Sequence, residues 1–193
     1  MKRDVKDQLA ELANWHGRMA FSAAYRILGN VADAEDAVQE VFLKLLDHRN
    51  GRLRLDAVRD WGAYLRVAAS RAAVDLLRSK PKWQQGNQEE GGEFEAVIEE
   101  NPRSLTIQRQ QAGLLRQAMR ALHNRDATVF ALRYFEDCSY EEIAEQMQIS
   151  VNSVGVILHR ARKRLREILE PIVGDTAPPN DRPERRAINT EGE

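Results

Sequence analysis

The sequence contains a single cysteine, Cys138, and no apolar run that approaches the length of a membrane span. One thiol cannot form a disulfide within the chain, and a transmembrane helix needs roughly 18 or more consecutive apolar residues. The first residues, MKRDVKDQLAELANWHGRMAF, are too charged for a secretory signal peptide. We therefore expect a cytoplasmic protein without membrane insertion.

The sequence also lacks the patterns that carry catalysis or hold metals. The four histidines, at positions 16, 48, 123 and 159, show no metal-ligand spacing. There is no glycine-rich phosphate loop, and no nucleophile is accompanied by a recognisable base and orienting residue. We expect a binding protein, not an enzyme, with no cofactor.

Charge is balanced overall but unevenly distributed. The formal net charge is only -1, yet residues 81–101 contain one lysine and six glutamates. The stretch HRARKRLRE, residues 159–167, instead gathers five arginines and lysines. An acidic connector thus separates two basic blocks, and such a basic run is either a solvated helix face or a nucleic-acid contact.

Hydrophobic periodicity predicts helices throughout and no strands. In the first block we expect helices over about 5–28, 33–46 and 60–79, separated by Gly29-Asn30 and by a loop over 48–60. Asp33 is the expected N-cap of the second helix. The expected buried stripe of the first helix is Leu9, Leu12, Trp15, Met19, Ala23 and Ile27.

The predicted fold is all-α, with two small helical domains joined by a flexible linker. The N-terminal domain spans 1–80, the acidic linker 81–104, the C-terminal domain 105–173 and a disordered tail 174–193. Residues 139–162 contain a short helix, a turn at Gln148-Ile149 and a second helix capped by Ser150. This order predicts a helix-turn-helix, in which Ala144 permits close helix crossing while Ile149 and Val154 fill the corner.

The second helix of this motif would enter the major groove of DNA, so we call it the recognition helix. Arg160 and Lys163 are expected within reach of phosphates. The residues expected to face upstream DNA are Asn152, Ser153, Gly155, Val156, His159, Arg160 and Lys163.

Two other sets of polar residues are either ordinary solvent-exposed helix faces or binding surfaces. Asp36, Gln39 and Glu40 lie along one side of the second helix, as on any solvated helix face. A basic track interleaved with aromatic residues suits single-stranded nucleic acid, although periodicity alone does not require it. Its members are Arg49, Arg52, Arg54, Trp61, Arg66, Arg71 and Arg78.

Three segments together resemble the extracytoplasmic-function (ECF) type of bacterial RNA polymerase sigma factor. YRILGNVADAEDAVQEVFLKLL (25–46) resembles the core-binding region and AYLRVAASRAAVDLLR (63–78) the promoter-melting helix. LRYFEDCSYEEIAEQMQISVNSVGVILHRARKRLREIL (132–169) resembles the upstream-element reader. The resemblance implies a factor that binds core polymerase, directs it to specific promoters and helps to open the DNA.

The resemblance also implies partners and site residues. Four residues lie at positions where members of the family contact the clamp helices of the largest polymerase subunit: Asp36, Gln39, Glu40 and Leu43. The C-terminal domain lies where members of the family contact the flap of the second subunit. Loop 48–60 and the following helix fall where the family holds the non-template strand. An anti-sigma factor or accessory protein is a further expected partner.

The recognition helix departs from the family pattern. Two customary basic residues are absent, Gly155 lies in its first turns, and Gln148 replaces a common glycine in the preceding turn. In the segment that resembles the promoter-melting helix, Arg71 replaces a customary asparagine. Val156 and Ile157 are then expected to contact thymine methyl groups or an accessory protein. A helix-turn-helix regulator that binds duplex DNA without polymerase, and an adaptor that binds polymerase without opening promoters, are the alternatives.

Overall fold

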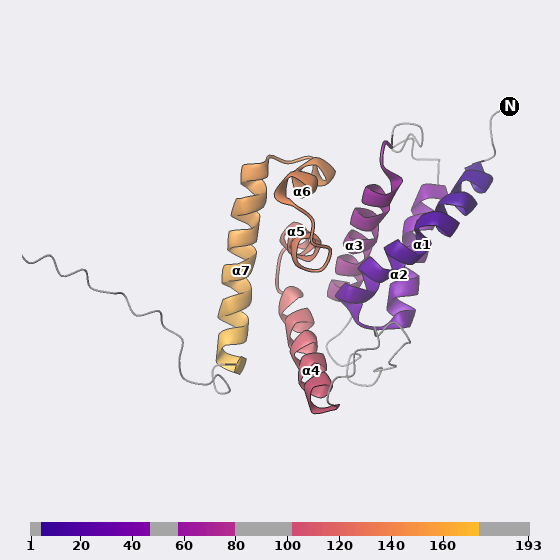
Figure 1. Cartoon of the computed structure of the whole chain (residues 1–193). Coiled ribbons are helices and arrows are strands. Elements are labelled where there is room, and N and C mark those ends of the chain that lie inside the picture. Colours follow the sequence, from indigo (N-terminus) through magenta and orange to yellow (C-terminus); the bar gives the residue numbers. More distant parts are fainter. Residues whose placement is uncertain (1–4, 47–57, 80–101, 174–193) are drawn as a thin grey trace, which may run out of the picture.

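The computed structural model describes residues 5–46, 58–79 and 102–173 of the 193-residue chain. Within these ranges it contains seven helices and no strand, which confirms the all-α prediction (Figure 1). Most of the predicted loop, the linker up to residue 101 and the tail 174–193 lie outside the described residues. The helices are α1 (Val5–Leu28), α2 (Val31–Leu46), α3 (Trp61–Ser79), α4 (Pro102–Met119), α5 (Asn124–Tyr134), α6 (Tyr140–Met147) and α7 (Val151–Val173).

Helix α1 ends as predicted but buries a different stripe. Gly29 adopts a φ of +75°, a left-handed conformation that suits glycine after a helix. Leu9, Ala23 and Ile27 are buried, whereas Trp15 is 82% exposed. Because a helix turns by roughly 100° per residue, Trp15 lies about 140° from the centre of the buried stripe. Placing Trp15 in the core was therefore wrong.

Helix α2 begins two residues before the predicted N-cap. The Asn30 Oδ1 accepts a 2.8 Å hydrogen bond from the Asp33 backbone N–H, so Asn30 is the capping residue. Asp33 lies at the third position of the helix and is buried. The Gly29-Asn30 pair therefore both ends α1 and starts α2, which leaves a very short connection between the two helices.

The second group of helices, α4 to α7, starts earlier than the sequence indicated. Helix α4 begins at Pro102 and not near residue 105. Proline is favoured at the first position of a helix because its missing N–H would have no partner there and its φ is already helical. The linker predicted over 81–104 thus extends at most to residue 101 in this structure.

The predicted helix-turn-helix is present in α6 and α7. Ser139 caps α6 in a capping box, accepting from the Glu142 N–H while the Glu142 carboxylate accepts from the Ser139 N–H. Gln148 ends α6 in the left-handed conformation with a φ of 54°. Ser150 then accepts from the Ser153 N–H at 3.1 Å and starts α7, as predicted. Val154 and Ala144 are buried between the two helices.

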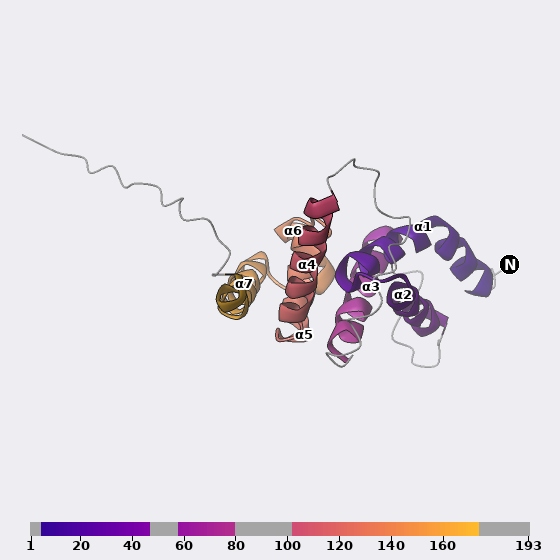
Figure 2. The ribbon, with the colours of Figure 1, turned by 90° about the horizontal axis from the view of Figure 1, so that it is seen from below.

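Helix α3 is the central element because it is covered on both sides. It lies between α1 and α2 on one side and the α5–α6 region on the other (Figures 1 and 2). Leu65 and Ala69 belong to a large cluster that also includes Met119 and Phe130 of the second group. Val67 belongs to a smaller cluster with residues of α5, α6 and α7. The two groups of helices therefore share their hydrophobic core.

Polar contacts also join the two groups. Arg26 donates from Nη1 to the Phe135 carbonyl at 3.0 Å and to the Glu136 carboxylate at 2.9 Å. Arg116 of α4 donates from Nε to the Ile27 carbonyl at 3.2 Å, so it binds the C-terminal end of α1. The Asn124 amide at the start of α5 bonds to Asp75 of α3. Polar contacts at three places thus join helices α1 to α3 to the second group, α4 to α7.

Candidate nucleic-acid interface

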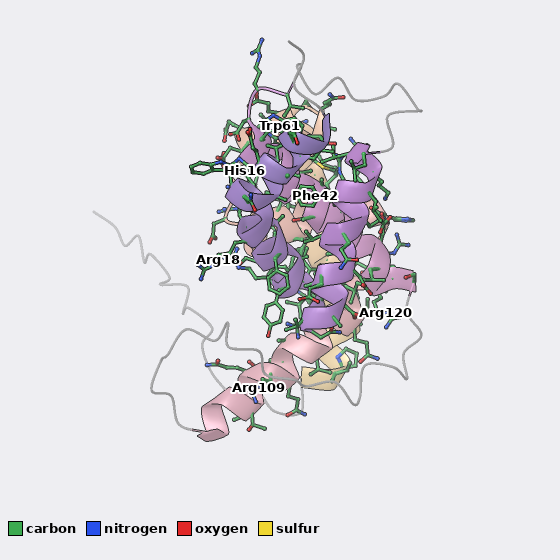
Figure 3. All side chains as sticks on the ribbon, turned by 90° about the vertical axis from the view of Figure 1, so that its right-hand side faces the viewer. His16, Arg18, Phe42, Trp61, Arg109 and Arg120 are labelled. Atoms are coloured by element: carbon green, nitrogen blue, oxygen red, sulfur yellow. The ribbon has the colours of Figure 1, made fainter. Side chains whose placement is uncertain are left out.

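The predicted polymerase-contact residues form a single exposed face of α2. Asp36, Gln39, Glu40 and Leu43 are all exposed, and Leu43 retains 62% of its accessible surface. The opposite side of α2 is buried in the core through Ala34, Ala37, Val41 and Leu45. Glu40 pairs with Lys44 at 2.5 Å along the helix. Helix α2 lies on the outer side of the first group, with α4 to α7 behind it (Figure 3).

The aromatic part of the predicted single-strand track stands at the start of α3. Asp60 caps this helix, accepting from the Ala63 N–H at 2.9 Å. Trp61 is half-buried and meets Tyr64 edge to face, with ring centroids 5.6 Å apart. Burial raises the pKa of the Tyr64 hydroxyl and the nearby Arg71 charge lowers it in part. Trp61 lies beside His16 at one end of the first group (Figure 3).

The described arginines of that track have different surroundings. Arg66 is partly buried and donates to the Cys138 Sγ at 3.8 Å and the Met19 Sδ at 4.0 Å. Arg71 donates to the Met147 Sδ of α6 at 3.0 Å. Arg78 is exposed near the end of α3, and Arg49, Arg52 and Arg54 lie outside the described residues. In this arrangement Arg66 and Arg71 contact protein sulfur atoms at the interface between the groups.

Cys138 is buried at the same interface. Burial raises the pKa of its thiol, and the hydrogen bond and charge of Arg66 offset part of that rise. Its backbone N–H donates to the Leu132 carbonyl at 3.0 Å. These features are those of a free cysteine that packs as a small hydrophobe.

The recognition helix α7 separates a buried stripe from an exposed one. Val154, Leu158, Ala161 and Leu165 are buried. On the other side the structure exposes Asn152, Val156, His159 and Lys163, with Gly155 intermediate. Helix α7 lies at the edge of the molecule farthest from α1 and α2 (Figure 1). The exposed stripe therefore stays accessible even though the two groups are packed together.

Two of the residues expected to face DNA are engaged within the protein. The Ser153 Oγ lies 2.7 Å from the Ser150 Oγ in the cap of α7. Arg160 forms a bidentate pair with Asp126 of α5, at 2.7 Å from Nε and 2.5 Å from Nη2. These hydrogen bonds and the Asp126 charge raise the pKa of Arg160. Arg160 thus joins α7 to α5, while more than half of its side chain stays exposed.

Ile157 does not lie on the DNA-facing side. It is only 6% exposed and packs in the cluster that contains Val67 and Ile143. It lies three residues after Val154 on the buried side of the helix, so the sequence period already allowed this placement. The expectation that Ile157 contacts thymine or an accessory protein was wrong, whereas Val156 is 56% exposed.

Two charged residues that organise this region, Asp126 and Arg116, were not predicted from the sequence. Asp126 is buried and pairs with Arg160. From the sequence alone, an acidic residue near the start of a helix is explained by its favourable interaction with the helix dipole, which does not indicate a distant partner. Arg116 binds the end of α1, and burial lowers its pKa. Nothing in the local sequence of α4 indicates a contact 89 residues away.

In the described ranges, no group of three or more histidine, cysteine, aspartate or glutamate residues is placed to hold a metal ion. None of the helices described is both long and apolar enough to cross a membrane.

Comparisons with known proteins match both groups of helices. The family Sigma-70 region 2 matches residues 12–82, which include most of α1 and all of α2 and α3. The family Sigma-70, region 4 matches residues 112–165, from within α4 into α7. A solved structure of the sigma factor RpoE in complex with the anti-sigma factor NepR from Bartonella quintana is 20% identical, with a TM-score of 0.45; the match covers 88% of this chain and 98% of RpoE.

Among curated proteins, two relatives from Bacillus subtilis (strain 168) match along almost their whole length. ECF RNA polymerase sigma factor SigW is 25% identical over 89% of this chain and 94% of its own. RNA polymerase sigma factor SigV is 30% identical over 86% of this chain and 93% of its own. Each match covers more than four fifths of this chain and so includes residues of both groups of helices. The chain belongs to the RNA polymerase sigma factors, in their ECF group.

Proposed function

We propose that this sigma factor, which directs core RNA polymerase to promoters, divides that task among three surfaces. The α2 face made by Asp36, Gln39, Glu40 and Leu43 binds the clamp helices of the largest polymerase subunit. Loop 48–60 and α3 hold the unpaired downstream strand, and α7 binds the upstream element while its domain meets the flap. The protein acts in the cytoplasm by binding and not by catalysis.

The observation that supports this division most is the exposure of the α2 and α7 faces on opposite sides of the molecule. Both faces consist of residues that have no core role in the described structure. Helix α3 differs, because Arg66 and Arg71 contact Cys138 and Met147. The strand-holding surface must therefore be released from α6 before it binds DNA, and an anti-sigma factor or accessory protein can favour either state.

Run-off transcription with purified core RNA polymerase on sheared genomic DNA tests the proposal. We expect discrete new RNA starts that share an upstream motif when the protein is added. The double variant Gln39→Ala/Leu43→Ala should lose both core binding and the new starts, because it removes contacts from the exposed α2 face. Asn14→Ala is the matched control, because Asn14 is exposed on α1 and is not part of the α2 face.

Each alternative class predicts a different result. A protein that binds duplex DNA tightly without polymerase and yields no new starts would be a helix-turn-helix regulator. One that binds core polymerase without new starts would be an adaptor that requires a partner. If the double variant retained both core binding and starts, the α2 face would not be the polymerase contact.

A further inference from the structure

The recognition helix offers fewer contacts than its sequence suggested. Ser153 is held by Ser150, and Arg160 is held by the buried carboxylate of Asp126. The groups left to face DNA are Asn152, Val156, His159 and Lys163, all of them exposed. Val156 is the one apolar side chain among these four, and it is 56% exposed.

Gly155, which precedes Val156, faces the Tyr140 ring of α6, since a Cβ built on it would lie 3.8 Å from that ring. Val156 points about 100° away around the helix, and its isopropyl group is exposed. A base edge can approach it directly, as a recognition helix requires in the major groove.

The major groove presents one apolar group, the 5-methyl of thymine. An apolar side chain placed against any other base edge would leave a donor or acceptor without its partner. We infer that Val156 is the specificity-determining residue of the upstream contact and that it recognises a thymine methyl group. This inference rests on the proposed role of α7 in binding upstream DNA.

The test uses the full chain bound to core RNA polymerase and a promoter obtained from the run-off experiment. The probe is that promoter duplex with each upstream thymine replaced in turn by deoxyuridine, which lacks only the methyl group. At one position we expect affinity to fall about four-fold, the value for one buried methyl or methylene group. Val156→Ala should bind the thymine and deoxyuridine duplexes equally well.

Two control variants separate this effect from others. Ile172→Ala removes a side chain of similar exposure, 49%, at the far end of the same helix and should keep the four-fold preference. Lys163→Ala should weaken both duplexes alike and reduce the salt dependence of binding, because a phosphate contact carries no base preference.

Equal affinity of the wild-type holoenzyme for thymine and deoxyuridine at every upstream position would overturn the inference. A thymine preference unchanged in Val156→Ala would also overturn it and assign recognition to another residue. In both cases the promoter would still yield discrete starts, so the proposed function would stand. If the protein produced no new RNA starts, the proposed function would be wrong, and the inference about Val156 would be wrong as well.

Discussion

The Arg160–Asp126 pair shows how a single charged residue acquires a structural task. Asp126 is almost fully buried, whereas more than half of the Arg160 side chain is exposed. A buried carboxylate that loses its partner keeps its desolvation cost without compensation. The pair therefore fixes α7 to α5 and sets the orientation of the recognition helix.

We expect Arg160→Ala to lower the urea midpoint of unfolding more than Arg164→Ala does. Arg164 pairs with Glu167 at 3.2 Å, and both partners are about half exposed. Such surface pairs contribute only about 0–1 kcal/mol. Equal midpoints for the two variants, measured by circular dichroism with an unchanged denaturant slope, would contradict the structural role of Arg160.

Glu136 gives a pH-dependent prediction. Burial raises its pKa above the ordinary 4.5, although the charge and hydrogen bond of Arg26 oppose the rise. Above pH 4.5 the folded state then binds more protons than the unfolded state, so this group's contribution to stability falls as pH rises. Glu136→Gln should therefore be at least as stable as the wild type at pH 7, with the difference vanishing below pH 4.5.

Glu142→Gln is the matched control, because its shift has the opposite sign. Hydrogen bonds from Ser139 lower the pKa of the Glu142 carboxyl. Its contribution is present above the ordinary pKa and disappears as pH falls through the lowered value. This variant should be less stable than the wild type at pH 7. Unfolding curves that moved in the same direction for both variants would contradict the assigned causes.

At the scale of the element, α6 depends on its cap. It has only eight residues, too few for a helix to be stable by itself. Ser139→Ala removes one side of the capping box and should reduce the free energy of unfolding by about 1 kcal/mol. Ser79→Ala, whose exposed hydroxyl bonds to the Leu76 carbonyl at the end of α3, should change it by less than about 0.5 kcal/mol.

The helices themselves could be predicted from sequence because their signals are local. Gly29, Asp60, Ser139 and Ser150 mark helix ends through backbone conformation or caps formed within a few residues. At the start of α2 two local signals compete, because both Asn30 and Asp33 are residue types that cap helices. At Trp15 a spacing of three residues from Leu12 does not keep the side chain within the buried stripe.

At the scale of the whole molecule, the sequence could not predict that α3 is covered on two sides. Val67, Ala73 and Val74 are buried because helices from both groups cover α3. A small apolar residue has no local feature that tells which distant helix will cover it. The same limit applies to Arg66 and Arg71, whose partners Cys138 and Met147 lie more than 70 residues away.

Cys138 provides a probe for separation of the two groups. It is 7% exposed and lies against Arg66, so we expect slow alkylation in the free protein. Binding to core polymerase should accelerate the reaction at least several-fold if α3 leaves α6, as measured by mass spectrometry of the peptide that contains Cys138. Met119 is also buried but has no thiol, so it does not provide an internal reference for the alkylation rate. Urea-unfolded protein, in which Cys138 is fully accessible, sets the upper limit of that rate. Identical rates with and without polymerase would show that the groups stay packed.

The end of α1 carries a consequence for how this chain can vary. A Cβ on Gly29 would lie 2.6 Å from both terminal nitrogens of Arg116, which occupies the space where a side chain would begin. Any other residue would also be strained at a φ of +75°, by about 1–2 kcal/mol. Moving Arg116 aside would break its bond to Ile27. A methyl group at position 29 would thus push Arg116 away from the end of α1. Substitution of Gly29 would therefore weaken the contact between α1 and α4.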